Sequence, residues 1–189
     1  MRTGCIALFV LLAAALVAAP AGAQRREVDA KKSKIAFVYK LEKTVLVEGA
    51  FPRWRAQVAF DERQLAKSSV RFEIELAAID TGNSDGDKEA RRPRWFDVVS
   101  FPRAVFVSDE VRKTGNNRFE AAGKLTIKGK TRDQAIAFVT SAAAAGLAAQ
   151  GQFVIKRLEF GVGDGPWADL SQIADEVEVR FNLFLGPPG

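Results

Sequence analysis

Alternation between apolar and polar residues is the feature of this 189-residue chain that most constrains its fold. Three stretches show it clearly: KIAFVYK (34–40), SVRFEIEL (69–76) and EVEVRFNLFL (176–185). Because successive side chains of a strand point to opposite faces of the sheet, this period of two predicts antiparallel strands with one buried face. Weaker runs of the same kind occupy 44–48, 54–60, 103–108, 118–128, 134–140 and 150–157.

Turn signals separate these runs, at GNN (115–117), KGKT (128–131) and GDG (163–165). Short strands at regular spacing, with almost no helical period, predict an all-β domain that is either a sandwich or a single antiparallel barrel of about eight strands. We assign this one domain to residues 24–189. No internal repeat or linker divides it.

Two segments break the alternation. Residues 81–102 are polar at first, and we expect one short helix near Asp87–Arg91, followed by a loop that carries Trp95 and Phe96. The sequence SAAAAGLAAQ (141–150) is of low complexity and fits either a helical turn or the end of a hairpin. The pattern does not distinguish these alternatives.

The N-terminal 23 residues have the features of a signal peptide. Arg2 precedes an apolar run (6–19) that is short for a membrane span, and Ala21-Gly22-Ala23 resembles a signal-peptidase site. We therefore expect residues 1–23 to be cleaved and the mature protein to be secreted into the periplasm. Cleavage would also remove Cys5, the single cysteine.

The chain contains no histidine. Without histidine, and with its one cysteine in the signal peptide, the mature chain lacks the commonest ligands of zinc, haem and iron–sulfur centres and the residues of Ser-His-Asp or Cys-His catalysis. We expect no metal, no cofactor and no enzymatic activity. A carboxylate enzyme would need acids inside a cavity. Asp61, Asp97 and Asp169 lie in apolar contexts but are more simply turn or cap residues.

The net charge of +5 is modest. Basic residues are scattered, except in KEARRPRW (88–95), so we expect no nucleic-acid partner. An excess of this size is compatible with anionic lipid headgroups and equally with plain solubility.

Two glycine-containing motifs resemble phosphate-binding loops only superficially. In GVGDG (161–165) the third glycine comes one residue too early for a dinucleotide fingerprint, and Pro166 follows instead of a helix. In GKLTIKGKT (123–131) five residues separate the glycines, whereas a Walker loop needs four. We interpret the first motif as a bend at a barrel corner and the second as a strand with a hairpin turn.

Fourteen phenylalanines accompany one tyrosine and one methionine. Most fall on the apolar face of an expected strand. In a sandwich they would fill the core, whereas in a barrel of about eight strands they would line a cavity for one small ligand. Periodicity alone leaves both alternatives open.

Four motifs, in this order along the chain, resemble a known family and favour the barrel over the sandwich. They are D-T-G-N (80–83), W-F-D-x-x-x-F-P (95–102), G-x-L-T-I-x-G-x-T (123–131) and R-x-x-F-G-V-G (157–163). Together they resemble the YceI family of periplasmic lipid-binding proteins. The resemblance implies an extended, lipocalin-like antiparallel barrel whose long apolar channel holds a polyisoprenoid or similar chain.

Two local features qualify the resemblance. Many relatives carry a histidine after the first strand, where this chain has KLEK (40–43). The GDGPWAD ending (163–169) resembles the branch of the family found beside di-haem cytochrome b proteins. That branch implies a quinone or a membrane redox partner.

We therefore predict a periplasmic carrier or sequestering protein for a long-chain isoprenoid, a quinone or a similar amphiphile. The alternative is a ligand-free barrel that acts as an accessory protein for a cytochrome b-type or envelope partner. The oligomeric state stays open, and a dimer is compatible with the sequence. The residues expected to line the channel are Phe37, Tyr39, Phe60, Phe72, Ile74, Phe106, Leu125, Phe138, Phe153, Phe160, Val179 and Phe181. Those expected at its mouth are Arg91, Arg92, Arg94 and Trp95.

Overall fold

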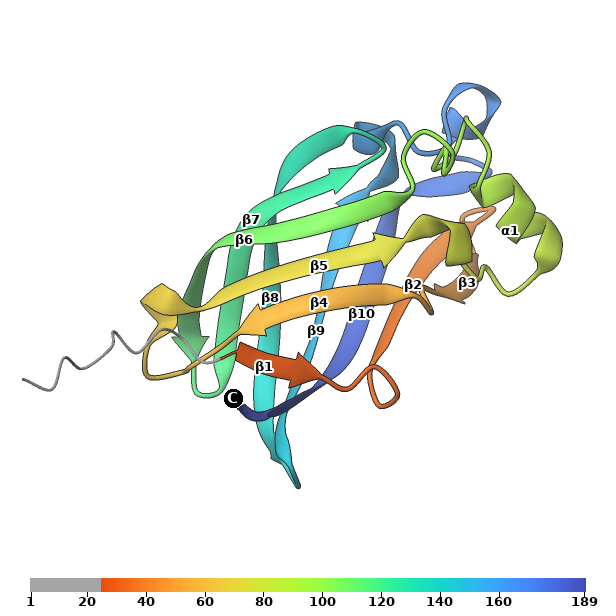
Figure 1. Cartoon of the computed structure of the whole chain (residues 1–189). Coiled ribbons are helices and arrows are strands. Elements are labelled where there is room, and N and C mark those ends of the chain that lie inside the picture. The colour runs from red at the N-terminus through yellow and green to blue at the C-terminus, as the bar shows by residue number, and fades with distance from the viewer. Residues whose placement is uncertain (1–24) are drawn as a thin grey trace, which may run out of the picture.

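The alternating stretches form the strands of one continuous antiparallel sheet (Figure 1). The computed structural model describes residues 25–189, so the predicted signal peptide lies outside the described residues. Within that range the strands are β1 (Arg25–Val28), β2 (Lys34–Leu41), β3 (Val45–Ala50), β4 (Trp54–Ala59), β5 (Ser69–Glu75), β6 (Arg103–Gly115), β7 (Arg118–Ile127), β8 (Lys130–Ala143), β9 (Gly146–Lys156) and β10 (Ile173–Pro188). The helical elements there are α1 (Ser84–Ala90) and the 3₁₀ turns η1 (Leu65–Lys67), η2 (Leu76–Ala78), η3 (Arg157–Phe160) and η4 (Gly165–Ala168).

Strand β1 closes the sheet into a barrel. It pairs with β4 on one side, where Arg26 faces Val58, and with β10 on the other, where Val28 faces Leu185. The ring therefore runs β1-β4-β5-β6-β7-β8-β9-β10 and back to β1, while β2 and β3 extend the sheet beside β10. These eight strands confirm the predicted all-β barrel and exclude the sandwich. Closure also leaves the ring without free strand edges.

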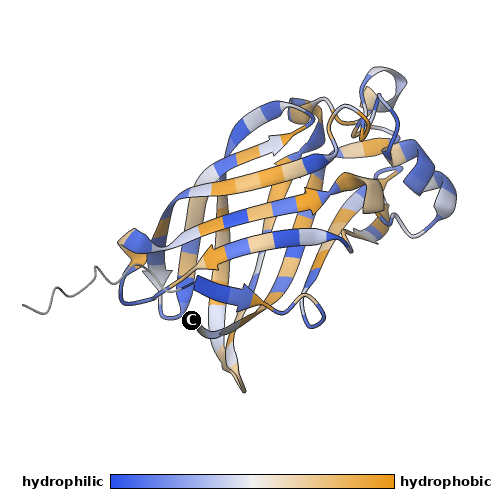
Figure 2. Cartoon of the chain, in the orientation of Figure 1, coloured by the Kyte–Doolittle hydropathy of each residue, from blue (hydrophilic) through white to orange (hydrophobic). Residues whose placement is uncertain are grey.

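The alternation of the sequence sets the two faces of the barrel wall. Bands of apolar and polar residues alternate along the strands in Figure 2. Paired residues of one row share a face, so Phe72 of β5, Phe106 of β6 and Leu125 of β7 meet across three neighbouring strands on the inner face. The residues between them point to the outer face, where β5 carries Arg71 and Glu73, while β6 carries Val105 and Val107.

Aromatic side chains fill the barrel near the β6–β7 hairpin. Phe119 is fully buried, and its ring lies 5.1 Å from that of Phe60 and 5.5 Å from that of Phe138. Such pairs add about 0.5–1.5 kcal/mol each beyond the area they bury. This part of the interior is therefore a packed core.

Helix α1 lies at the opposite end of the barrel from β1 and η1 (Figure 1). It spans Ser84–Ala90, so it begins before the predicted start at Asp87. The cause is Asn83, whose side-chain oxygen accepts a hydrogen bond of 2.7 Å from the backbone N–H of Gly86 and caps the helix. The Asp87 carboxylate accepts from the backbone N–H of Thr81 at 2.7 Å, which holds the helix against the chain that precedes it.

The low-complexity segment 141–150 is the end of a β-hairpin. Strands β8 and β9 pair as far as Ala143 and Gly146, which resolves the alternative left open by the sequence. Among the helices of residues 25–189, none is long and apolar enough to cross a membrane.

Candidate ligand-binding cavity

The barrel interior contains two adjacent cavities. The first, called here the narrow cavity, has a volume of about 110 Å³, and the second, the wide cavity, has about 490 Å³. They are adjacent because some residues line both. These shared residues are Ile74, Ala104, Leu125, Phe153 and Val179.

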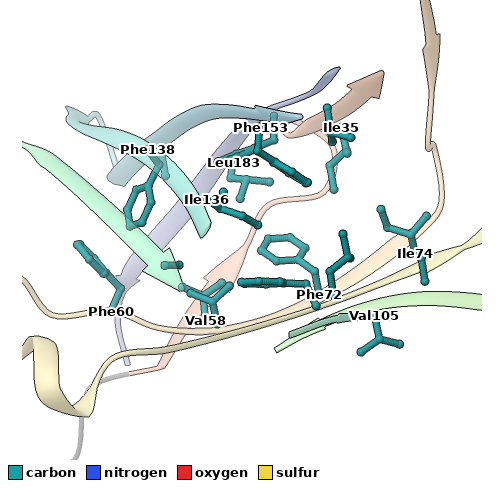
Figure 3. Close-up of a pocket in the computed structure, with 18 of the residues that line it drawn as sticks. Ile35, Val58, Phe60, Phe72, Ile74, Val105, Ile136, Phe138, Phe153 and Leu183 are labelled. Carbon is teal, nitrogen blue, oxygen red and sulfur yellow. The ribbon is translucent and has the colours of Figure 1, made fainter. Parts of the chain in front are cut away.

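The narrow cavity has an entirely hydrophobic wall. Figure 3 shows Phe72, Ile136 and Leu183 pointing into the same space from β5, β8 and β10. Phe60 and Phe138 close it toward the packed core, with ring centroids 5.9 Å apart. A charged or polar group placed here would lose its hydration without gaining a partner, at a cost of several kcal/mol (roughly 2–7). The narrow cavity is therefore suited to hydrocarbon.

The wide cavity lies at the end of the barrel that carries α1. Strand β2 contributes Phe37 and Tyr39, whose rings stack with centroids 6.3 Å apart. Unlike the narrow cavity, it also has polar residues in its wall. Asp85 and Glu89 of α1 line it, and each pairs with a basic residue on the outside, Lys88 and Arg92, at 3.0 Å.

Arg157 also lines the wide cavity and is only 2% exposed. Its guanidinium donates five hydrogen bonds of 2.7–3.0 Å to backbone carbonyl oxygens before β10. The acceptors are the carbonyl oxygens of Val162, Gly163, Trp167, Ile173 and Ala174. Burial lowers the pKa of the guanidinium, and the nearby Asp175 partly offsets that effect. Because all five N–H groups are bonded in this way, Arg157 holds the chain between η3 and β10 in one conformation.

The glycine-rich segment 161–165 lies between η3 and β10 and forms the predicted bend, called here the corner. Gly161, Gly163 and Gly165 have φ of 69°, 72° and 62°, a region that L-residues with side chains rarely adopt. The segment turns the chain from η3 toward β10 and brings Gly163 close to Trp95. The backbone N–H of Gly163 donates to the carbonyl oxygen of Arg94 at 2.8 Å, so the corner and the loop after α1 are joined.

Tyr39 is the single tyrosine of the chain and lies in the wall of the wide cavity. Burial raises the pKa of its phenol above the ordinary value of 10.0. The raised pKa follows from the low polarity of this wall, which disfavours the phenolate.

The structure places all twelve residues predicted to line a channel in the wall of one or both cavities. Ile74, Leu125, Phe153 and Val179 line both. Five others line only the narrow cavity, namely Phe60, Phe72, Phe106, Phe138 and Phe181. The remaining three line only the wide one, namely Phe37, Tyr39 and Phe160. Their role in binding a ligand stays a prediction.

The residues predicted at the mouth divide into two groups. Trp95 lines the wide cavity. Arg91, Arg92 and Arg94 belong to neither cavity wall: Arg92 pairs with Glu89, and Arg91 donates to the carbonyl oxygen of Ile79 at 3.4 Å. Arg91 and Arg92 therefore bond to the protein itself outside the cavity. Thr81, Trp167 and Arg157 are wall residues that were not predicted, although each lies in or beside one of the sequence motifs.

The three aspartates considered for a carboxylate enzyme lie away from the cavities. Asp61, Asp97 and Asp169 line neither of the two interior cavities. Asp169 accepts a hydrogen bond from the backbone N–H of Ser171, and Asp61 accepts one from that of Arg63, which are turn contacts. In the described part of the chain no three His, Cys, Asp or Glu side chains cluster as metal ligands.

Comparisons with known proteins agree with this geometry. Residues 27–185 match the family model of the YceI-like domain. A UPF0312 protein of Vibrio parahaemolyticus is 26% identical over 164 residues, which cover 85% of this chain and 77% of that protein. The crystal structure of Burkholderia cenocepacia BcnA is 38% identical with a TM-score of 0.80, and the match covers 83% of this chain and 98% of that one.

A more distant structure has the same fold. A polyisoprenoid binding domain from Saccharophagus degradans, implicated in plant cell wall breakdown, superimposes with a TM-score of 0.66 at 17% identity. The match covers 87% of this chain and 99% of that domain.

Proposed function

Because the chain belongs to the YceI-like domain family, we propose that it binds the hydrocarbon chain of an isoprenoid, a quinone or a similar amphiphile inside its barrel. The observation that carries this proposal is the pair of adjacent cavities, one wholly hydrophobic and one with a polar end. The polyisoprenoid binding domain of S. degradans, which has the same fold, supports the same class of ligand.

Apolar burial alone suffices to hold such a chain. Each buried methylene contributes about 0.8 kcal/mol. Summed over a chain of several isoprene units, this gain approaches or exceeds the ceiling of about −20 kcal/mol for non-covalent affinities. A useful affinity therefore remains even after the large cost of ordering the chain. Polar groups are then needed only to select and orient a headgroup.

The role of this binding is transport or sequestration of the lipid in the periplasm. The support for the location is the signal-peptide pattern of residues 1–23. A chain enclosed by the barrel is shielded from water, so the protein would carry an insoluble lipid through an aqueous compartment.

Thermal unfolding of delipidated protein tests the binding. A ligand that binds only the folded state stabilises it by about 2.7 kcal/mol at a hundredfold excess over its Kd. Squalene, an isoprenoid hydrocarbon, and a long-chain ubiquinone should therefore both raise Tm in a concentration-dependent way. An unchanged Tm with both compounds would contradict the proposal.

A second function, docking on a membrane partner such as a cytochrome b-type protein, is favoured by one observation. Large apolar side chains are exposed at the α1 end, with Val99 92%, Leu46 68% and Leu170 51% exposed. The last two belong to segments that are joined by the hydrogen bond from the N–H of Glu42 to the carbonyl oxygen of Gln172. The double variant L46D/L170D should then lose co-sedimentation with membranes while keeping its bound lipid.

A further inference from the structure

We infer that the headgroup of the bound lipid lies at the α1 end of the wide cavity, and that the indole N–H of Trp95 donates a hydrogen bond to an uncharged oxygen of that headgroup. This inference rests on the proposed function and adds the orientation of the ligand and the chemistry that selects it.

Three buried side-chain polar atoms of residues 25–189 have no hydrogen-bond partner, namely Arg91 Nε, Trp95 Nε1 and Asn182 Oδ1, and Trp95 is the one of the three residues that lines the wide cavity. Trp95 lines the wide cavity, and its Nε1 is buried with no hydrogen-bond partner anywhere in residues 25–189. A buried donor without a partner costs roughly 1–3 kcal/mol, and most buried polar groups in proteins avoid that cost. An acceptor on a ligand in the cavity would remove it.

The indole is held in place by its neighbours. Its ring centroid lies 5.6 Å from that of Trp167, and the guanidinium of Arg157 lies 5.7 Å from it. The backbone N–H of Trp95 donates to the carbonyl oxygen of Arg92 at 2.9 Å, and a methyl group on Gly163 would lie 3.1 Å from the ring. These contacts hold the ring in one position, so its N–H keeps one direction.

The two cavities determine the direction of the ligand. The wall of the narrow cavity is entirely hydrophobic and would leave a headgroup oxygen unpaired. Polar groups line only the wide cavity, where Thr81 and Tyr39 accompany Trp95. The hydrocarbon tail must therefore pass the shared residues into the narrow cavity, with the headgroup remaining at the α1 end.

The charges of the wide cavity favour an uncharged headgroup over a phosphate. Arg157 is the cation in this wall, and all five of its N–H groups already bond to backbone carbonyl oxygens. The other charged residues of the wall are Asp85, whose carboxylate is exposed and paired with Lys88, and Glu89, which is paired with Arg92. A phosphate would meet no free cationic donor there, whereas a quinone carbonyl or a phenol needs only one neutral donor.

The test compares two ligands on two variants of the full mature chain. Trp95→Phe removes the N–H and keeps an aromatic ring, while Trp54→Phe is the matched control, because Trp54 lies on β4 outside both cavity walls. W95F should weaken binding of a long-chain ubiquinone about tenfold, as expected for one lost hydrogen bond, and should leave squalene binding unchanged. W54F should leave both affinities unchanged.

Each outcome separates this inference from the proposed function. If squalene and ubiquinone bind but W95F weakens both equally or neither, the headgroup inference is wrong and lipid binding stands. If neither compound binds the wild type, both proposals are wrong. Tighter binding of a polyprenyl phosphate than of ubiquinone would overturn the selection for an uncharged oxygen.

A measurement on the wild type covers the case in which W95F does not fold. The indole N–H resonance of Trp95 in a ¹⁵N spectrum, assigned with W54F and W167F, should move downfield on addition of ubiquinone and much less on addition of squalene. Equal shifts with the two ligands would overturn the inference.

Discussion

The guanidinium carbon of Arg157 lies 5.7 Å from the centroid of the Trp95 ring. This contact joins the two segments that border the wide cavity, the loop after α1 and the corner before β10. A cation over a tryptophan face contributes about 0.5–2 kcal/mol, more when it is desolvated. The pair therefore couples the stability of the corner to the position of the residue that we assign to the headgroup.

Replacing Arg157 with methionine should strongly destabilise the protein. The change removes five hydrogen bonds and leaves buried carbonyl oxygens unpaired, so we expect a loss of about 3 kcal/mol or more in the free energy of unfolding. Urea denaturation measures it. The control is Arg132→Met, because exposed Arg132 makes one cross-segment bond, of 3.1 Å to the carbonyl oxygen of Glu159, and should cost under about 1 kcal/mol. Equal effects of the two changes would contradict this role of Arg157.

Gly163→Ala should destabilise the corner and displace Trp95. Gly163 has φ of 72°, and an added methyl group would collide with Nη1 of Arg157 and press on the Trp95 ring. We expect a loss of about 1–3 kcal/mol, together with a changed tryptophan emission spectrum. Gly115→Ala is the matched control, because the added methyl would meet only the flexible side chain of Arg118, at 3.3 Å. A G163A variant as stable as wild type would contradict the account.

The raised pKa of Tyr39 makes the stability of the folded protein depend on pH. Because burial raises its pKa above 10.0 in the folded state, the folded protein holds the phenol proton more tightly than the unfolded chain does. The resulting stability is fully present below pH 10 and is lost as pH rises through the folded-state pKa. Phenolate absorbance reports this pKa without interference, because the chain has one tyrosine.

Lipid binding should raise the Tyr39 pKa further, because a ligand in the wide cavity would exclude water from the phenol. Tyr39→Phe should in turn show a flatter loss of stability above pH 10. A pKa that stays the same on saturation with ubiquinone would place the ligand away from Tyr39.

Ala104→Phe should block passage between the cavities. Ala104 is 7% exposed and lines both of them, so a phenyl ring there would fill the space that they share. We expect a long-chain ubiquinone to lose most of its affinity, while a ubiquinone with a single isoprene unit, which needs only the wide cavity, keeps its own. Overpacking costs about 1–3 kcal/mol, which unfolding measurements would separate from the binding effect. Ala135→Phe, on the exposed face of β8, should change neither affinity.

The strands and the composition of the barrel lining were predictable from the sequence, because alternation specifies which side chains face inward. Closure into a barrel rather than a sandwich was predicted only from the resemblance to the YceI family. Phe72, Phe106 and Leu125 could be assigned to the interior before their strands were paired. The start of α1 was not predicted correctly, because it depends on the cap formed by Asn83 rather than on helical periodicity.

The sequence pattern did not predict the buried arginine in the wall of the wide cavity. In the alternation of β9, Arg157 falls on the same face as Phe153 and Ile155, which line the wide cavity. A charged residue was not predicted on this inner face, and its burial depends on the carbonyl oxygens of the corner that follows it.

Arg91, Arg92 and Arg94 were predicted at the mouth but lie outside both cavity walls. Arg92 pairs with Glu89 and Arg91 donates to the carbonyl oxygen of Ile79, contacts that the sequence pattern does not encode.

Mass spectrometry of the natively bound lipid tests the central claim most directly. The full-length precursor is expressed in a bacterial host, and the mature protein is purified from the periplasm without detergent and extracted with organic solvent. The account predicts a stoichiometric isoprenoid lipid with an uncharged oxygen-bearing headgroup. Extracts that contain no isoprenoid, from folded protein whose Tm is unmoved by squalene and ubiquinone, would contradict it.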